Sequence, residues 1–219
     1  MLARLHERTS VLNRWISRWA QALAAGLIAV AAVAPAHADG EAEALVKKIA
    51  ADVIDGAKSD KAIQGGDVSK VIALVDAKVM PSVNFEAMTR SAVGPKWREA
   101  TPEQRTKLQG EFKTLLVRVY AGALTQISDR TVEVTKTQPV PNSQQVVVQS
   151  EVRGKGEPIK LDYRLDKGDA GWKIIDVNVG GIWLVTSYRS QFGQELANGG
   201  IDALITKLAE RNKAAGAKS

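Results

Sequence analysis

The sequence predicts an α+β domain in which an antiparallel sheet lies between two helical regions. Apolar residues recur every three or four positions from residue 41 to about 128, every second position between residues 131 and 179, and again at helical spacing from residue 182 onward. These are the periods of amphipathic helices and half-buried strands. Because the strand patterns follow one another directly, we expect an antiparallel meander whose dry face is covered by helices.

Four helical patterns precede the sheet. The first covers residues 41–59, the second opens with Asp67 as its expected cap, and a short third helix is expected over residues 83–93. The motif Thr101-Pro102-Glu103-Gln104 has the form of a capping box with Pro at the first helical position. It predicts the start of the longest helix, which persists to about residue 128.

About four strands are expected next. Their patterns centre on residues 131–135, 146–148, 159–166 and 172–179. In the third pattern, apolar residues alternate strictly with charged ones, which indicates one dry and one solvated face. The fourth is apolar on both faces, as is typical of a strand in the middle of a covered sheet.

The chain ends in a second helical region. Helical spacing returns at Ile182 and resumes after Gly199-Gly200. We expect residues 39–212 to form one domain and residues 213–219 to form a disordered tail.

The N-terminal segment has the features of a secretory signal peptide. Four arginines precede an apolar run over residues 20–34, and Ala36-His37-Ala38 then forms a small-x-small cleavage pattern. We expect residues 1–38 to be removed by cleavage near Ala38-Asp39, although an uncleaved N-terminal anchor is the alternative. The apolar run is shorter than the roughly 20 residues that span a membrane, and a chain without Cys cannot be lipidated as a lipoprotein.

Composition excludes several classes of function. The only histidines are His6 and His37 and there is no Cys, so the processed chain would lack thiolate and imidazole catalysts and the usual zinc ligands. No catalytic residue, metal or cofactor is therefore expected. Basic and acidic residues alternate along the chain, which does not favour nucleic-acid binding despite the net charge of +6.

Four stretches resemble a known family. They are residues 79–89 (VMPSVNFEAMT), 94–104 (GPKWREATPEQ), 176–192 (DVNVGGIWLVTSYRSQF) and 200–205 (GIDALI). In sequence and in order these are similar to the periplasmic phospholipid-binding proteins of the Mla (maintenance of lipid asymmetry) pathway, also called the toluene-tolerance family. One departure from the family pattern is Gly180-Gly181-Ile182-Trp183, where an extra Gly and a large Trp would alter the loop at a cavity mouth.

The resemblance implies a fold, a cargo and partners. The fold would be of the NTF2-like type, with helices wrapped on a curved antiparallel sheet around an apolar cavity. The function would be that of a monomeric periplasmic carrier in a Gram-negative bacterium, with bound phospholipid as cargo. Its partners would be an outer-membrane lipoprotein–porin complex and an inner-membrane ABC transporter with an MCE-domain subunit.

A carrier of this kind needs an interior about as apolar as a bilayer. Each methylene removed from water contributes roughly 0.8 kcal/mol, so two acyl chains represent on the order of 24 kcal/mol. We expect a cavity near the top of the usual range of roughly 300–1,000 Å³. The apolar faces supply the candidate lipid contacts, each of which could equally be ordinary core: Phe85, Met88, Val93, Trp97, Leu116, Tyr120, Leu124, Leu161, Tyr163, Ile175, Val177, Val179, Ile182, Val185, Tyr188 and Phe192.

The sequence also offers candidate polar contacts for the lipid headgroup, and two alternative functions remain open. Arg90 and Arg189 are candidate headgroup contacts, although solvated salt bridges are the commoner role of such residues. One rival function is an NTF2-like enzyme that uses Asp176 and Tyr163, with Asp162 as a second carboxylate. The simpler interpretation places both carboxylates on the solvated sheet face or in cross-strand pairs with Lys160, Lys173 or Arg164. The other rival is a protein-interaction module that binds no lipid.

Overall fold

The computed structural model describes residues 36–127, 129–154 and 156–216. The expected signal peptide lies outside the described residues up to position 35. The region around the expected cleavage site forms the beginning of the first described helix, α2 (Ala36–Ser59).

Four of the helices before the sheet begin at side-chain caps. Asp67 accepts hydrogen bonds from the backbone N–H groups of Ser69 and Lys70, and the predicted capping box between Thr101 and Gln104 is confirmed. Such caps satisfy N–H groups that have no partner within the helix. The elements are α3 (Lys61–Gln64), α4 (Val68–Lys78), η1 (Met80–Ser82), α5 (Phe85–Val93), η2 (Gly94–Arg98) and α6 (Pro102–Thr125).

The sheet is an antiparallel meander with the strand order β1-β2-β3-β4-β5. This confirms the predicted α+β class, but the expected number of about four strands is wrong, because the sheet has five. Gly180 and Gly181 both have positive φ, 59° and 94°, and form a tight turn that pairs Val179 with Ile182. The strands are β1 (Thr131–Pro139), β2 (Gln145–Arg153), β3 (Ile159–Gly168), β4 (Gly171–Val179) and β5 (Ile182–Trp183).

The last helix therefore begins two residues later than the sequence pattern predicts. It is α7 (Leu184–Gly216), and Gly200 interrupts it with φ 72° and ψ −160°. The interruption matches the predicted break after Gly199-Gly200. Only Gly adopts this backbone conformation without steric cost.

An irregularity in β4 changes which of its side chains face the helices. Arg164 pairs with Asp176 and Leu165 pairs with Ile174, so Ile175 is an extra residue in the ladder. A bulge of this kind shifts the two-residue alternation by one position and increases the local twist. Ile174 and Val177 therefore lie on the same face of the sheet, and Ile175 does not share that face with them.

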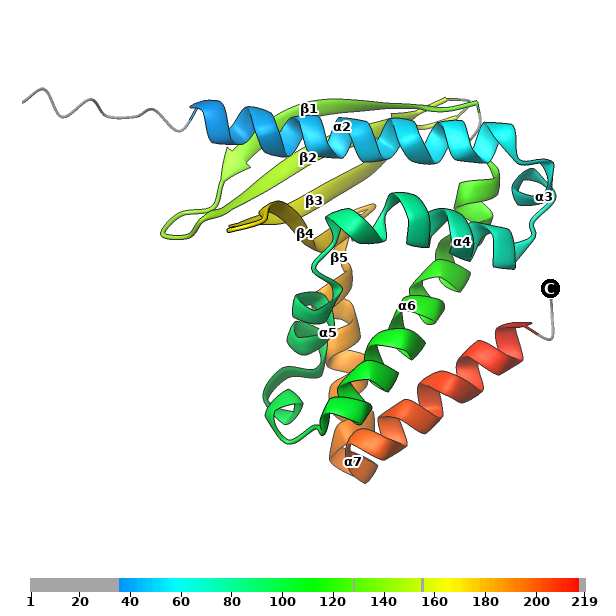
Figure 1. Ribbon diagram of the computed structural model, residues 1–219, viewed down its shortest axis with the longest axis vertical. Coiled ribbons are helices and arrows are strands. Elements are labelled where there is room, and N and C mark those ends of the chain that lie inside the picture. Colours follow the sequence, from blue (N-terminus) through cyan, green and yellow to red (C-terminus); the bar gives the residue numbers. More distant parts are fainter. Residues whose placement is uncertain (1–35, 128, 155, 217–219) are drawn as a thin grey trace, which may run out of the picture. The chain divides into compact units, whose positions relative to one another are not determined.

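Helix α2 lies along the sheet and contacts β1 and β2, and the face of the sheet toward α2 is its inner face (Figure 1). Helix α6 contacts α4, α5 and α7. Buried residues of α2, such as Val46, pack with Val148 and Leu165 of the sheet. A second cluster, the aromatic core, joins α5, η2, the first half of α6 and α7 around Phe112 and Phe192. A third cluster joins the end of α2, α3 and α4 to the second half of α6.

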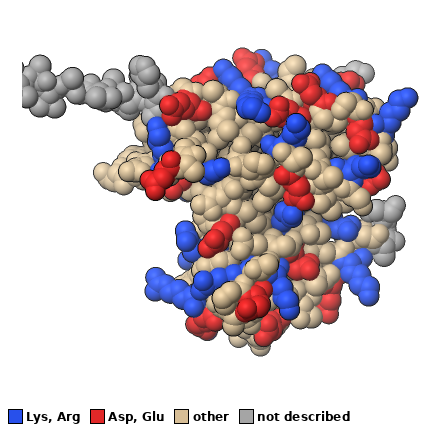
Figure 2. All heavy atoms as spheres, in the orientation of Figure 1, with Lys and Arg blue, Asp and Glu red and all other residues tan. Residues whose placement is uncertain are grey.

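Basic and acidic side chains are mixed over the face of the molecule that Figure 2 shows. Most of the ion pairs join exposed groups, such as Lys48 with Asp52 along α2 and Lys96 with Glu99 in η2. Pairs of this kind contribute little to stability. The described part of the chain includes no helix with both the length and the apolar character needed to cross a membrane.

Candidate functional site

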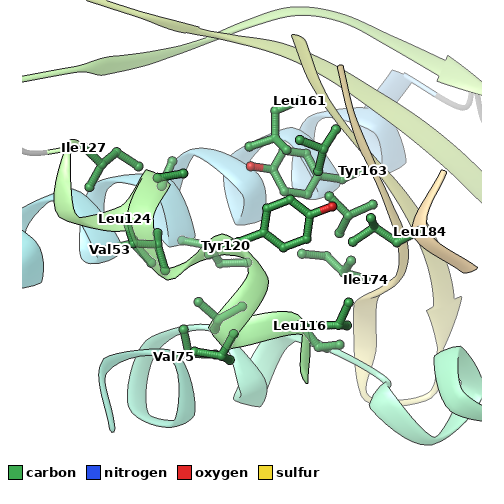
Figure 3. A pocket seen from close by; sticks show the side chains of 18 of the residues that line it. Val53, Val75, Leu116, Tyr120, Leu124, Ile127, Leu161, Tyr163, Ile174 and Leu184 are labelled. Atoms are coloured by element: carbon green, nitrogen blue, oxygen red, sulfur yellow. The ribbon is translucent and has the colours of Figure 1, made fainter. Parts of the chain in front are cut away.

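A cavity of about 400 Å³ lies between the inner face of the sheet and helices α2, α4, α5 and α6. Figure 3 shows the rings of Tyr120 and Tyr163 projecting into this space from α6 and β3. The volume lies in the lower half of the usual range for ligand sites, below the value expected from the sequence.

The walls of the cavity are almost entirely aliphatic and aromatic. The described lining residues with polar side-chain groups are Lys113, Gln126, Arg130 and the two tyrosines. Burial raises the pKa of Tyr163 and of Tyr120 above their usual value, so both phenols remain neutral at physiological pH. The interior thus offers apolar surface and two neutral hydroxyl groups, an arrangement suited to hydrocarbon rather than to a charged ligand.

Nine of the sixteen residues predicted to contact lipid line the cavity. They come from α5, the second half of α6 and the inner positions of β3 and β4: Phe85, Met88, Leu116, Tyr120, Leu124, Leu161, Tyr163, Val177 and Val179. Leu161 pairs with Val179 and Tyr163 with Val177, which places these four side chains on one face of the sheet.

The other seven predicted contacts lie outside the cavity lining. Val93, Trp97, Tyr188 and Phe192 are buried in the aromatic core. Ile175 is the bulge residue of β4, Ile182 is 60% exposed on β5, and Val185 lies in the first turn of α7. Arg90 and Arg189 are both exposed, and neither lines the cavity.

Several lining residues were not singled out from the sequence. Ile49 and Val53 of α2 belong to the apolar stripe that predicts this helix, so their inward orientation was accessible from the sequence. Val75 of α4 and Val79 after it belong to the predicted second helix. Ile174 could not be found in this way, because the bulge that turns it inward leaves no signal in the two-residue period.

The geometry argues against the enzyme hypothesis. Tyr163 faces the cavity, whereas Asp176 pairs with Arg164 on the opposite face of the sheet. Asp162 precedes Tyr163 in β3 and therefore also points away from it. A carboxylate and a phenol on opposite faces cannot act on one substrate. Within the described ranges, no group of three His, Cys, Asp or Glu side chains could hold a metal ion.

Asp176 instead joins the sheet to the last helix. Its Oδ1 accepts hydrogen bonds from the backbone N–H groups of Val177 at 2.8 Å and Val185 at 3.0 Å. Val185 lies in the first turn of α7, where N–H groups have no partner within the helix. Burial raises the pKa of Asp176 above its ordinary value of 3.8, and these two hydrogen bonds and Arg164 oppose the increase. Arg164 in turn lies 4.7 Å from the ring centroid of Trp183 in β5.

We expect Asp176→Ala to lower the free energy of unfolding by about 1–3 kcal/mol, because the N–H of Val185 would lose its acceptor. Asp176→Asn keeps an acceptor oxygen and should cost less. Urea titrations of the two variants and the wild type measure these differences. Equal stability of the alanine variant and the wild type would contradict this role.

Because of the raised pKa of Asp176, the stability difference between the wild type and Asp176→Asn should depend on pH. Because the folded state holds the Asp176 proton more tightly than the unfolded state does, protonation favours folding. The stability of the wild type relative to Asp176→Asn should be greatest below pH 3.8 and should fall as the pH rises through the folded-state pKa. Urea titrations of both proteins across this range measure it, and a relative stability that rises with pH would contradict the assignment.

Comparison with known proteins places the chain in a family. A sequence model of the family described as MlaC protein matches residues 47–210, which is more than half of the chain. The chain belongs to the MlaC family. The resemblance seen in the four sequence stretches is thereby confirmed.

Two curated MlaC relatives match at low identity. The intermembrane phospholipid transport system binding protein MlaC of Haemophilus influenzae is 23% identical over 88% of this chain and 92% of its own length. The toluene tolerance protein ttg2D of Pseudomonas putida is 27% identical over 56% of this chain. That match spans only 57% of the Pseudomonas protein.

A solved structure shares the fold. The phospholipid-binding protein from Ralstonia solanacearum, determined in complex with a phospholipid, is 40% identical to this chain with a TM-score of 0.77. The similarity covers 80% of this chain and 99% of the Ralstonia chain. The arrangement of helices around an antiparallel sheet is therefore a property that this MlaC family member shares with a protein that binds a phospholipid.

Proposed function

We propose that this chain binds the acyl chains of a phospholipid in the cavity between its sheet and α6, and carries the lipid through the periplasm. The observation that carries the proposal is the apolar lining of that cavity. Membership of the MlaC family and the likeness to a phospholipid-binding protein from Ralstonia support it. The expected partners are an outer-membrane lipoprotein–porin complex and an inner-membrane ABC transporter with an MCE-domain subunit.

The nine predicted residues in the lining are the proposed acyl-chain contacts, together with Ile49, Val53 and Ile174. Their side chains offer an environment close to that of a bilayer interior. Transfer of an acyl chain between such environments changes the free energy little, so extraction and release can both occur. The residues of the aromatic core would act indirectly, by holding α5 and α6 in place beside the cavity.

Export of the chain belongs to the same proposal. Residues 1–38 would serve as the signal peptide, and the processed chain would reach the periplasm without a lipid anchor. A carrier of this kind uses no nucleotide of its own, so the energy for directed transport would come from a partner. Direct action as an enzyme is not part of the proposal, since Asp176 and Tyr163 lie on opposite sheet faces.

The test is to identify what the purified protein carries. Organic extraction followed by mass spectrometry should recover phospholipid at close to one molecule per chain. Protein stripped of lipid should take up phospholipid again from vesicles. A chain that carries no lipid after purification and takes none from vesicles would contradict the proposal and favour a protein-interaction module.

A further inference from the structure

Two charged residues line the cavity, and they differ in their partners. Lys113 of α6 forms an ion pair in which its Nζ lies 2.8 Å from Asp76 Oδ1 of α4. Arg130, just before β1, has a buried Nη1 atom with no hydrogen-bond partner among the described residues. A buried donor without a partner costs free energy and requires an explanation. Arg130 is therefore the charged side chain of the lining that retains unused binding capacity.

The side chain of Arg130 passes close to Gly154, the residue after β2. A Cβ atom at Gly154 would lie 2.8 Å from Arg130 Cγ, so only Gly leaves room for this side chain. The lining near Arg130 also includes Val132 of β1 and Val152 of β2. Arg130 thus belongs to the connection between α6 and β1, and the neighbouring lining residues are apolar.

Two acidic side chains near this end of the sheet are paired with another residue. Glu133 and Glu151 both form ion pairs with Arg153, at 3.1 and 3.0 Å. In the part of the chain that the structure describes, no ion pair joins Arg130 to a carboxylate. An anion that reaches Arg130 would therefore not displace a carboxylate from this chain.

We propose that the guanidinium of Arg130 binds the phosphodiester of the phospholipid whose acyl chains occupy the cavity. The inference rests on the proposed function. Guanidinium groups bind phosphate through paired, charge-assisted hydrogen bonds. A phosphate at Arg130 would direct the acyl chains along the inner face of α6, past Leu124 and Tyr120. The headgroup beyond the phosphate remains in solvent, so the site selects phosphate-bearing lipids without selecting the headgroup alcohol.

The experiment compares two lipids with the same acyl chains, one with phosphate and one without. Lipid-free full-length protein is incubated with vesicles containing either phosphatidylglycerol or diacylglycerol, re-isolated, and analysed by mass spectrometry. We expect Arg130→Gln to lower phosphatidylglycerol uptake about tenfold and to leave diacylglycerol uptake unchanged. Arg98→Gln, an exposed Arg-to-Gln change in η2, is the matched control and should alter neither.

A second variant tests the position of the side chain. Gly154→Ala introduces the methyl group that would overlap the stem of Arg130, and should reproduce the selective loss of phosphatidylglycerol uptake with the guanidinium still present. Arg130→Lys keeps the charge but not the paired donors, so it should give an intermediate loss.

Each alternative has a distinct outcome. Equal loss of both lipids in Arg130→Gln, or no loss of either, overturns the assignment. Inorganic phosphate that binds the wild type through Arg130 while lipid uptake is unaffected by the variant identifies a free-anion site, which also overturns it. Failure of the wild type to take up either lipid would instead contradict the proposed function itself.

Discussion

Tyr120→Glu is expected to abolish phospholipid retention while the protein remains folded. The ring of Tyr120 projects into the middle of the cavity (Figure 3), so a carboxylate at this position would face the proposed acyl chains without a partner. An unpaired ion in an apolar environment costs several kcal/mol, which corresponds to at least a hundredfold loss of affinity. Mass spectrometry of the re-isolated protein measures lipid per chain, and circular dichroism measures helix content.

The neighbouring position provides the matched control. Val119 lies next to Tyr120 on α6 but is 55% exposed, so Val119→Glu adds the same charge to the outer side of the same helix. This variant should retain lipid at the wild-type level. If Tyr120→Glu also retains it, the acyl chains do not occupy this cavity.

Phe192→Ala should lower the free energy of unfolding by about 3–5 kcal/mol, which is typical of the removal of a buried aromatic side chain. Phe192 is 1% exposed, and its ring centroid lies 5.1 Å from that of Phe112 and 5.6 Å from that of Tyr188. Because Phe192 does not line the cavity, each chain that remains folded should carry the wild-type amount of lipid. Chemical denaturation measures the stability, and mass spectrometry of the folded fraction measures the lipid.

The smaller change Phe192→Leu provides a second test in case Phe192→Ala does not yield enough folded protein. It keeps most of the buried volume, so a smaller loss of stability and unchanged lipid content are expected. Loss of lipid from folded Phe192→Leu, without a comparable loss of stability, would instead identify Phe192 as a direct lipid contact. Lipid content therefore distinguishes a residue that lines the cavity from a residue of the core behind it.

Much of the fold could be predicted because its elements depend on local patterns. The capping box at Thr101 and Gln104 and the cap at Asp67 satisfy N–H groups within one turn, so neighbouring residues suffice to predict them. The antiparallel meander follows from consecutive strands with short connections. Strand β5 was missed because two residues are too short to show a period, and it depends on the turn at Gly180 and Gly181.

The candidate site could be predicted only in part. Leu161, Tyr163, Val177 and Val179 were placed correctly on one face because all four lie on the same side of the bulge, where the strand period is unbroken. At Ile175 one extra residue shifts the alternation, and Ile174 takes the inward position instead. No pattern in the sequence singles out Arg130. Its place in the lining depends on where α6 ends and on the absence of a side chain at Gly154.

The sequence by itself determined most of the helices and strands, most of the faces that avoid water, and the family to which the chain belongs. Only the tertiary structure decided which of those faces border a cavity. Phe85 and Phe192 have the same helical apolar pattern, yet Phe85 lines the cavity and Phe192 is buried in the aromatic core. The reason is that hydrophobic periodicity indicates only that a side chain is removed from water. Whether that side chain then faces a cavity or another side chain depends on the packing of segments that are distant in sequence.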